Sequence, residues 1–327
     1  MTLRPGPVGS SQALACLAWL AASAAVAACG GEDAPRAAAG SGLSGSVTMA
    51  RPAELAAVGA AAAAGFQAAH PNVRVAPAPA GHDAGARVCA GRVQVVLAIA
   101  APSRAGRRAC ARRGQRLAAI PIGTAAVAYV ANRGLGMDCL TTVQLRRLWQ
   151  RGSRITTYRA IDAGLPPVRV ALSGSPPGSA AAAQFAAVAG GPRGRLRRDA
   201  DRTGSDVSVL ARVADARGGS GFVPSSVFAA GPRGAAPVSI RAGGACVAPT
   251  AAAIASGRYP ALAAPVVAVV TAHAAQRPAT GSLLAWMLDR NGEIAAAAGL
   301  VPLTGAARAA AERRLAALRA GAPQGEG

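Results

Sequence analysis

A Gly-Ser pair at the start of a helix is the clearest candidate for binding chemistry in this sequence. Residues 168–172 alternate as a strand does, a Gly/Pro/Ser stretch follows, and Gly178, Ser179 and Ala180 lead into an alanine-rich helix over residues 180–189. A strand, a loop of small residues and a helix in this order present backbone N–H groups to a negatively charged oxygen. The segment therefore predicts an oxyanion site built from backbone amides.

Residues for catalysis do not accompany this loop. The three histidines are far apart in the sequence, no serine has the turn residues of a hydrolase nucleophile, and lysine, which phosphate-cradling loops use, is absent. Three histidines and dispersed cysteines also disfavour a His-rich metal site. We expect a binding protein that is not an enzyme and that carries no cofactor and no metal.

Composition sets the limits on fold and partners. The chain has 327 residues, 52% of them apolar, which is enough for one large or two ordinary domains. Its formal net charge is +21, and every basic residue is arginine. Aromatic residues make up only 3%, which argues against a stacking platform for nucleic acid. We interpret the arginine excess mainly as the coding bias of a GC-rich genome, with an anionic partner as the alternative.

The N-terminal segment predicts export. Residues 1–28 contain one charge, Arg4, and end in an apolar run over residues 13–28 that is short and alanine-rich for a membrane span. Small residues directly before Cys29 resemble the bacterial lipoprotein signal, in which that cysteine is acylated. The alternative is ordinary secretion with an incidental cysteine. We expect a signal peptide over residues 1–28, a lipid on Cys29, a flexible tether over residues 29–44, and a location on the outer face of the cytoplasmic membrane.

Cysteine usage agrees with that compartment. Cys89, Cys110, Cys139 and Cys246 remain once the signal and the lipidated residue are set aside, an even number in an exported chain. Three pairings are open from sequence alone. Cys89 with Cys110 closes a local loop and leaves Cys139 with Cys246, and free buried thiols are the alternative to both disulfides.

Short β-rich runs alternate with helical segments along the rest of the chain. Strand patterns cover residues 46–49, 73–77, 93–100 and 125–132, and helix patterns cover residues 52–69 and 141–149. This succession is typical of an α/β protein.

The order of four longer segments resembles the phosphate-binding proteins of bacterial phosphate ABC transporters, in particular a lipoprotein branch of that family. The segments are residues 66–75 (FQAAHPNVRV), 138–149 (DCLTTVQLRRLW), 206–222 with its glycine-rich end (GGSGF), and 245–250 (ACVAPT). The four cysteines fall where that branch has its cysteines. The resemblance covers residues 46–303.

The resemblance implies a two-lobed, type II periplasmic-binding-protein-like α/β fold with two hinge crossovers. We expect the first crossover near residues 122–129 and the return near residues 218–223. One lobe would comprise residues 45–124 and 222–305 and the other residues 125–221, and residues 306–327 would form a C-terminal helix and tail.

The resemblance also implies four ligand loops. They contain Ser46, Val47 and Thr48; Gly81 and His82; Ser103 and Arg104; and Gly178, Ser179 and Ala180.

These loops depart from the family at several positions. Val47 replaces a hydroxyl residue, His82 is new, and Gln94 stands where relatives have an aspartate. Phosphate carries a proton near neutral pH, so a carboxylate acceptor favours it over sulfate. We expect a loss of phosphate specificity unless Asp83 turns inward to replace the acceptor.

Two functions remain open from the sequence. The first is a monomeric lipoprotein that captures an inorganic oxyanion, above all phosphate, for the permease subunits of an ABC transporter, with no nucleic acid partner. The second is a divergent paralogue with weak or no phosphate binding that acts as a surface sensor or interaction protein.

Overall fold

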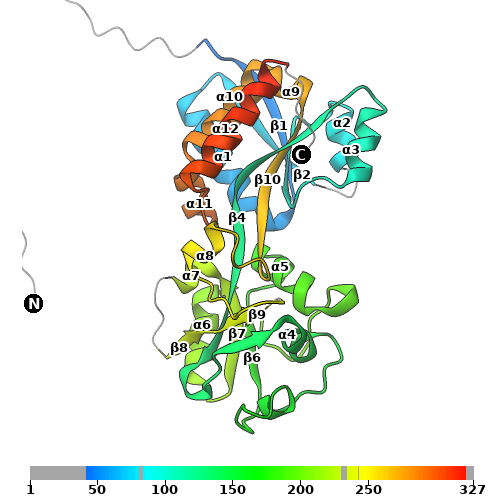
Figure 1. Ribbon diagram of the computed structural model, residues 1–327. Coiled ribbons are helices and arrows are strands. Elements are labelled where there is room, and N and C mark those ends of the chain that lie inside the picture. The colour runs from blue at the N-terminus through cyan, green and yellow to red at the C-terminus, as the bar shows by residue number, and fades with distance from the viewer. Residues whose placement is uncertain (1–41, 81–83, 230–233, 242, 322–327) are drawn as a thin grey trace, which may run out of the picture. The chain divides into compact units, whose positions relative to one another are not determined.

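The computed structural model describes residues 42–80, 84–229, 234–241 and 243–321, and two hydrophobic cores in these residues share one long strand. That strand is β4 (Leu117–Asn132), which runs from the first core into the second (Figure 1). The predicted signal segment, Cys29 and most of the predicted tether lie outside the described residues. No helix in the described ranges is both long and apolar enough to cross a bilayer.

One mixed sheet carries both cores. Its strand order is β2 (Val73–Pro79), β1 (Gly45–Arg51), β3 (Val95–Ile99), β10 (Ala263–Thr271), β4, β7 (Gly219–Pro224) and β6 (Ala171–Gly174), and β8 (Ala235–Pro237) also pairs with β4. The first three strands are parallel, β10 is antiparallel to β3 and β4, and β7 is antiparallel to β4 but parallel to β6. A separate parallel pair joins β5 (Cys139–Thr141) to β9 (Ser239–Arg241). Because crossover helices link the parallel strands, the predicted α/β class is confirmed.

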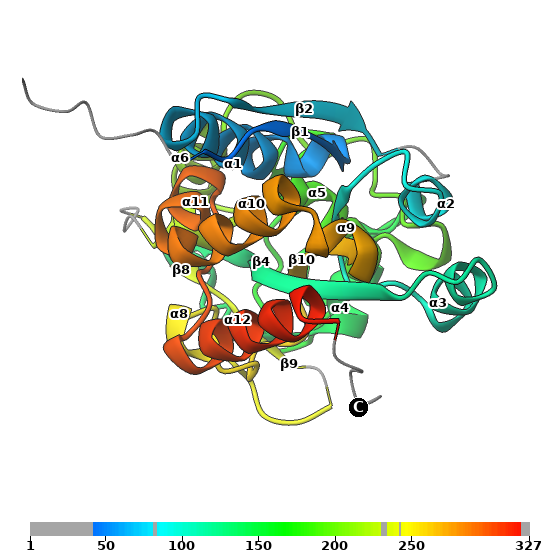
Figure 2. The same cartoon turned by 90° about the horizontal axis from the view of Figure 1, so that it is seen from above.

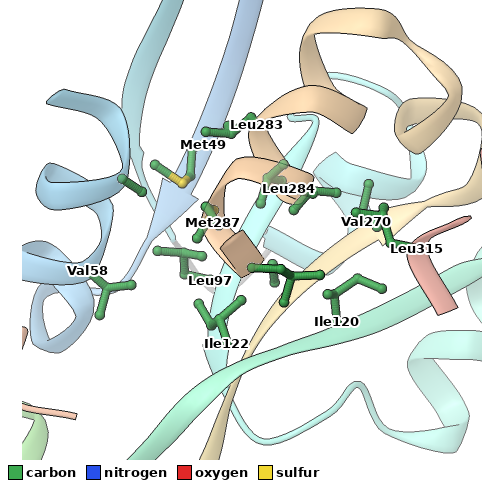
Figure 3. Packing of buried hydrophobic residues seen from close by; sticks show 14 of the residues in the cluster. Met49, Val58, Leu97, Ile120, Ile122, Val270, Leu283, Leu284, Met287 and Leu315 are labelled. Carbon is green, nitrogen blue, oxygen red and sulfur yellow. The ribbon is translucent and has the colours of Figure 1, made fainter. Parts of the chain in front are cut away.

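Helices cover both faces of the first half of the sheet. Alternate residues along a strand point to opposite faces, so Val95 and Leu97 of β3 enter one cluster and Val96 enters another. The larger cluster, drawn in Figure 3, packs against η1 (Ala53–Leu55), α1 (Ala56–Ala69), α9 (Ala272–Gln276), α10 (Pro278–Asp289), α11 (Asn291–Ala298) and α12 (Gly305–Arg319). The smaller cluster packs against α2 (Ala84–Cys89) and α3 (Arg104–Ala111).

Aromatic side chains dominate the second core. The Phe185 and Phe222 rings stack at 4.0 Å between centroids, and Trp149 lies edge-on to both. Trp149 Nε1 donates to Tyr129 Oη over 3.0 Å. Its helices are η2 (Arg133–Leu135), α4 (Thr142–Trp149), η3 (Tyr158–Ala160), α5 (Ala180–Ala189) and α8 (Ala251–Ala255), and η4 (Gly191–Arg193) follows α5. A smaller cluster on the other face of β4 and β7 packs against α6 (Asp206–Asp215) and α7 (Ser225–Phe228).

β4 passes between the cores through a bulge. Its pairing with β10 shifts register so that Ile122 has no partner between Pro121 and Gly123, and a bulge is one of the few places where a strand accepts proline. Asn291 Nδ2 donates to the Ile122 carbonyl over 2.8 Å. Beside it, Thr124 and Val301 exchange two backbone hydrogen bonds of 2.9 Å. The bulge is therefore fixed by a side chain and by a second chain segment.

The return crossing differs from the prediction for residues 218–223. Residues 219–223 belong to β7, which pairs with the second half of β4. Further along the chain, Val238, Ile254 and Leu262 still pack into the second core. The chain returns instead through β10. The glycines that suggested a crossing have another cause: a Cβ at Gly221 would lie 2.0 Å from the Ser173 carbonyl oxygen, so only glycine fits between β7 and β6.

Two disulfides staple the halves separately. Cys89 pairs with Cys110 and ties α2 to α3, and Cys139 pairs with Cys246 across 107 residues. This is the pairing expected from the sequence, in which the first bond closes a local loop. The longer loop stabilises more in the chain-entropy model, by about 5 against about 3 kcal/mol.

We predict that Gly123→Ala destabilises the fold by about 1 to 3 kcal/mol. Gly123 has φ +150°, and a Cβ there would lie 3.2 Å from Leu300 Cδ1 and 3.3 Å from the Val301 carbonyl oxygen. Urea unfolding measures the change. The matched control is Gly292→Ala, since Gly292 is exposed in α11 with open space around it, and alanine there is neutral or stabilises by up to about 1 kcal/mol. Equal effects at both sites would contradict the prediction.

The tyrosines predict a loss of stability at alkaline pH. All three, Tyr129, Tyr158 and Tyr259, are buried. Burial raises the pKa of Tyr129 to about 12 and also raises the pKa of Tyr158 and Tyr259. Since the unfolded tyrosines ionise first, near about pH 10, stability is complete below that pH and is lost as pH rises through the folded values.

Lysine does not obscure this titration because the chain has none. The free energy of unfolding, measured with urea between about pH 9 and about pH 11, should fall with pH by up to ~1.4 kcal/mol per pH unit for each tyrosine. Tyr129→Phe should make this dependence on pH weaker. Tyrosinate absorbance gives the ionisation directly. A midpoint independent of pH over this range would show that the tyrosines ionise freely in the folded protein.

Candidate functional site

A cavity of about 290 Å³ lies where the two cores meet. The first core contributes η1, the start of α1 and the end of α11, and the second core contributes the starts of α5 and α6 and the end of β7. The middle of β4 forms its floor. The lining residues are Ala53, Glu54, Ala56, Ala57, Ala125, Ala126, Val127, Gly178, Ser179, Ala180, Ala181, Gln184, Asp206, Pro224, Ala298, Gly299 and Leu300.

The start of α5 supplies hydrogen-bond donors to this cavity. Ser179 is the N-cap: its Oγ accepts from the Ala182 N–H over 3.2 Å and donates to the Pro176 carbonyl over 2.8 Å. The first N–H groups of a helix have no carbonyl partner within it, and among the described residues none is recorded for Ala180 or Ala181. Those two amides and the positive end of the helix dipole therefore face the cavity for an anion.

Two carboxylates line the same cavity. Glu54 follows β1, in η1, and has no hydrogen-bond or ion-pair partner among the described residues. Asp206 opens α6 and accepts a 2.6 Å hydrogen bond from the buried Ser175 hydroxyl. Since the described part of the chain brings no arginine or histidine to the lining, its side-chain charge is negative.

The arginines next to the cavity in the sequence are directed elsewhere. Arg51 ends β1 and packs on α1 at Gly59, where its Nε is buried without a partner among the described residues. Arg202 Nε donates to the Ser175 carbonyl over 3.3 Å, and burial lowers the pKa of its guanidinium. Neither guanidinium therefore lines the cavity.

The floor is held from the second core. Tyr259 Oη donates to the Val127 carbonyl over 3.1 Å, and the Val127 N–H donates to the Leu262 carbonyl over 2.9 Å. Both hydrogen bonds fix β4 where it lines the cavity. No group of His, Cys, Asp and Glu in the described ranges is arranged to hold a metal ion.

Three of the four expected ligand loops fall within the described residues, and one of these three lines the cavity. Gly178, Ser179 and Ala180 line it. Ser46, Val47 and Thr48 lie inside β1, where Val47 is fully buried and the Thr48 N–H donates to Gln94 Oε1 over 2.8 Å. The strand continues to Arg51, so the loop that reaches the cavity comes several residues later.

The third expected loop lies away from the cavity, and the second cannot be compared with it. Gly81 and His82, with Asp83, are outside the described residues. Ser103 caps α3 by accepting from the Gly106 N–H over 3.1 Å, and it and Arg104 are exposed and do not line the cavity. Gln94 is buried between β1 and the Gly91 carbonyl, to which its Nε2 donates over 3.0 Å.

Glu54 and Asp206 are the charged lining residues, and the sequence interpretation assigned neither to the site. Each lies in the first turn of a helix, where carboxylates are common for reasons of capping and dipole alone. The sequence feature that could have identified them is their position directly after a strand or loop that faces the predicted anion site. The expected loss of carboxylate acceptors is thus offset by two other carboxylates.

Comparison with known proteins extends these observations. No protein-family model matches the chain. Protein SphX of Synechococcus elongatus is 27% identical over 256 residues, which is 76% of this chain and 75% of that protein.

Solved structures share the arrangement of elements. A possible phosphate-binding protein from Planctomyces limnophilus superposes with a TM-score of 0.79 at 21% identity, over 84% of this chain and 99% of the other. An ABC-type phosphate transport receptor from Vibrio cholerae gives 0.60 at 15% identity, over 78% of this chain and 99% of the other. The chain has the two-lobed periplasmic-binding-protein fold of these phosphate-binding proteins.

Proposed function

We propose that this protein is an extracytoplasmic solute-binding lipoprotein that captures an inorganic oxyanion, above all phosphate, for an ABC transporter. The observation that carries the proposal is the cavity between the two cores, into which α5 directs the free N–H groups of Ala180 and Ala181. The structures of similar fold, one described as a possible phosphate-binding protein and one as a phosphate transport receptor, support phosphate as the ligand. The permease subunits of the transporter would receive it, and no chemical step is required.

The proposal includes a lipid on Cys29 and a location outside the cytoplasmic membrane. The small residues before Cys29 and the apolar run at residues 13–28 support it. Globomycin, which blocks lipoprotein signal cleavage, should cause the precursor to accumulate, and Cys29→Ser should release the protein from membranes.

The carboxylates of Glu54 and Asp206 discriminate between phosphate and sulfate. Phosphate near neutral pH carries a proton that Glu54 or Asp206 accepts in a hydrogen bond, whereas sulfate has none and is repelled by both. Two carboxylates and two free amides therefore favour a protonated oxyanion over a fully ionised one.

One observation favours the second candidate function, a paralogue that senses or binds a partner and holds phosphate weakly or not at all. Within the described residues the cavity has no cationic side chain, and the Ser179 hydroxyl is occupied within its own helix turn. Calorimetric titration with phosphate, sulfate and molybdate separates the two. A micromolar dissociation constant for phosphate supports capture for transport. The absence of binding of all three anions overturns it.

Replacing Ser179 tests the position of the site. Ser179→Trp should reduce phosphate affinity at least about a hundredfold, because the indole fills the space in front of the α5 amides and removes about 1 to 3 kcal/mol of charge-assisted hydrogen bonding at each. The matched control is Thr304→Trp, since Thr304 is the exposed N-cap of α12 and accepts from the Ala307 N–H over 3.2 Å. Normal affinity in Ser179→Trp would place the site elsewhere.

Removing the carboxylate charges tests the selection. Glu54→Gln with Asp206→Asn should lower the ratio of phosphate to sulfate affinity about tenfold or more, because sulfate is no longer repelled and the proton of phosphate loses a charged acceptor. The amide oxygen introduced by Asp206→Asn can still accept from Ser175, so the fold is kept. Asp289→Asn, at an exposed residue paired with Arg290, is the control. An unchanged ratio would show that neither carboxylate contacts the ligand.

A further inference from the structure

The segment around α2 and α3 is rich in arginine and contains no acidic residue. Eight arginines lie in or between α2, α3 and the turn that leads to β4, and no aspartate or glutamate occurs from residue 84 to residue 137. Seven of them are exposed, and no ion pair within the described ranges involves any of the eight. They are Arg87, Arg92, Arg104, Arg107, Arg108, Arg112, Arg113 and Arg116.

A second cavity of about 300 Å³ opens beside these arginines. Arg113 lines it from the turn after α3, His273 lines it from α9, and Arg277 follows α9. As far as the chain is described, the lining contains no carboxylate; its other polar members are Gln94, Gln115 and Thr271. Figure 2 shows α9 next to α2 and α3, and the Cys89–Cys110 disulfide fixes α2 to α3 at the edge of the cavity.

The chemistry of this surface matches phosphate groups carried on a larger anion. Guanidinium groups bind phosphate oxygens with paired hydrogen bonds, and Arg113 and Arg277 have no side-chain partner among the described residues to give up. Stacking on nucleobases has no support here, because no Phe, Trp or Tyr occurs between residues 84 and 128.

We propose that this surface, α2, α3 and the cavity lined by Arg113, His273 and Arg277, docks the protein on an anionic phospholipid bilayer, with the cavity taking a lipid phosphate. The proposal rests on the lipid-anchored state given under the proposed function. A lipid on Cys29 would keep Gly45 within about 55 Å of the bilayer in any chain conformation.

The point of chain entry agrees with this orientation. A Cβ at Gly45, where β1 begins, would lie 3.6 Å from Ala279 Cβ, and Ala279 is two residues after Arg277. The N-terminal segment thus enters the first core beside the cationic cavity. In Figure 1, α9 lies at the end of the first core that is farthest from β6 and β7, so docking there leaves the cleft at the middle of β4 uncovered.

Vesicle sedimentation tests the docking. The full chain with Cys29→Ser is compared with a chain that also carries Arg112→Gln, Arg113→Gln and Arg277→Gln. The matched control carries Arg151→Gln, Arg154→Gln and Arg159→Gln, at three exposed arginines of the second core that have no side-chain partner in the described ranges, with the same change in net charge. Vesicles contain phosphatidylglycerol or only phosphatidylcholine.

The cationic-surface variant should lose at least about tenfold in partition onto phosphatidylglycerol vesicles, and the control should lose much less. Raising salt should weaken the binding of the parent chain, because the Debye length falls. Equal losses in the two variants, or equal binding to phosphatidylcholine, would overturn the proposal. Phosphate titration of the same variants distinguishes failure of this proposal from failure of the proposed function. If no variant binds phosphate but the parent chain binds vesicles as expected, the proposed ligand is wrong and the docking surface stands.

Discussion

The requirement that β4 serve two cores governs the rest of this structure. One strand supplies Ile120 to the first core and Tyr129 to the second, so its faces must be matched to different neighbours at its two ends. The bulge at Ile122 makes that change possible, and Asn291 completes it by donating to the Ile122 carbonyl while its Oδ1 accepts from the Leu303 N–H over 2.8 Å. The floor of the cleft is the stretch of β4 directly after this bulge.

The large net positive charge of the chain is not reflected in the lining of the cleft. In a chain of net charge +21, none of the described residues that line the cavity is cationic, and the partial positive charge at its lining is that of the N-terminus of α5. Backbone amides fixed by a helix need little reorganisation to bind an anion, and in the proposed function the two carboxylates beside them would select among anions. The arginines are concentrated elsewhere, above all around α2 and α3.

Local patterns predicted the elements well, because strand alternation and helix caps depend on neighbouring residues. The helix predicted from Thr141 is α4, and its capping box with Gln144 is formed. The α5 start was found for the same reason. Matching positions to the family pattern was less informative. The residues expected to form the first ligand loop lie inside β1, because the end of this strand depends on the pairing of Arg51 with Pro79. The residues expected to form the return crossover lie mostly in β7. Glu54 was not assigned to the site, since only the packed fold shows which first-turn carboxylates face a cleft.

The path of the chain has a consequence for the order in which the protein can assemble during synthesis. The second core is built almost wholly from one continuous stretch, residues 126–262, whose ends meet where Ala126 pairs with Ala263. Its contacts, including the Cys139–Cys246 bond, can form while the C-terminal segment that follows is still absent. The half of the sheet that packs on the first core cannot form in this way, because β10 lies between β3 and β4 and is the last of these strands to be synthesised. The edge of β3 therefore stays unpaired until β10, which follows the whole second core in the sequence, has been made.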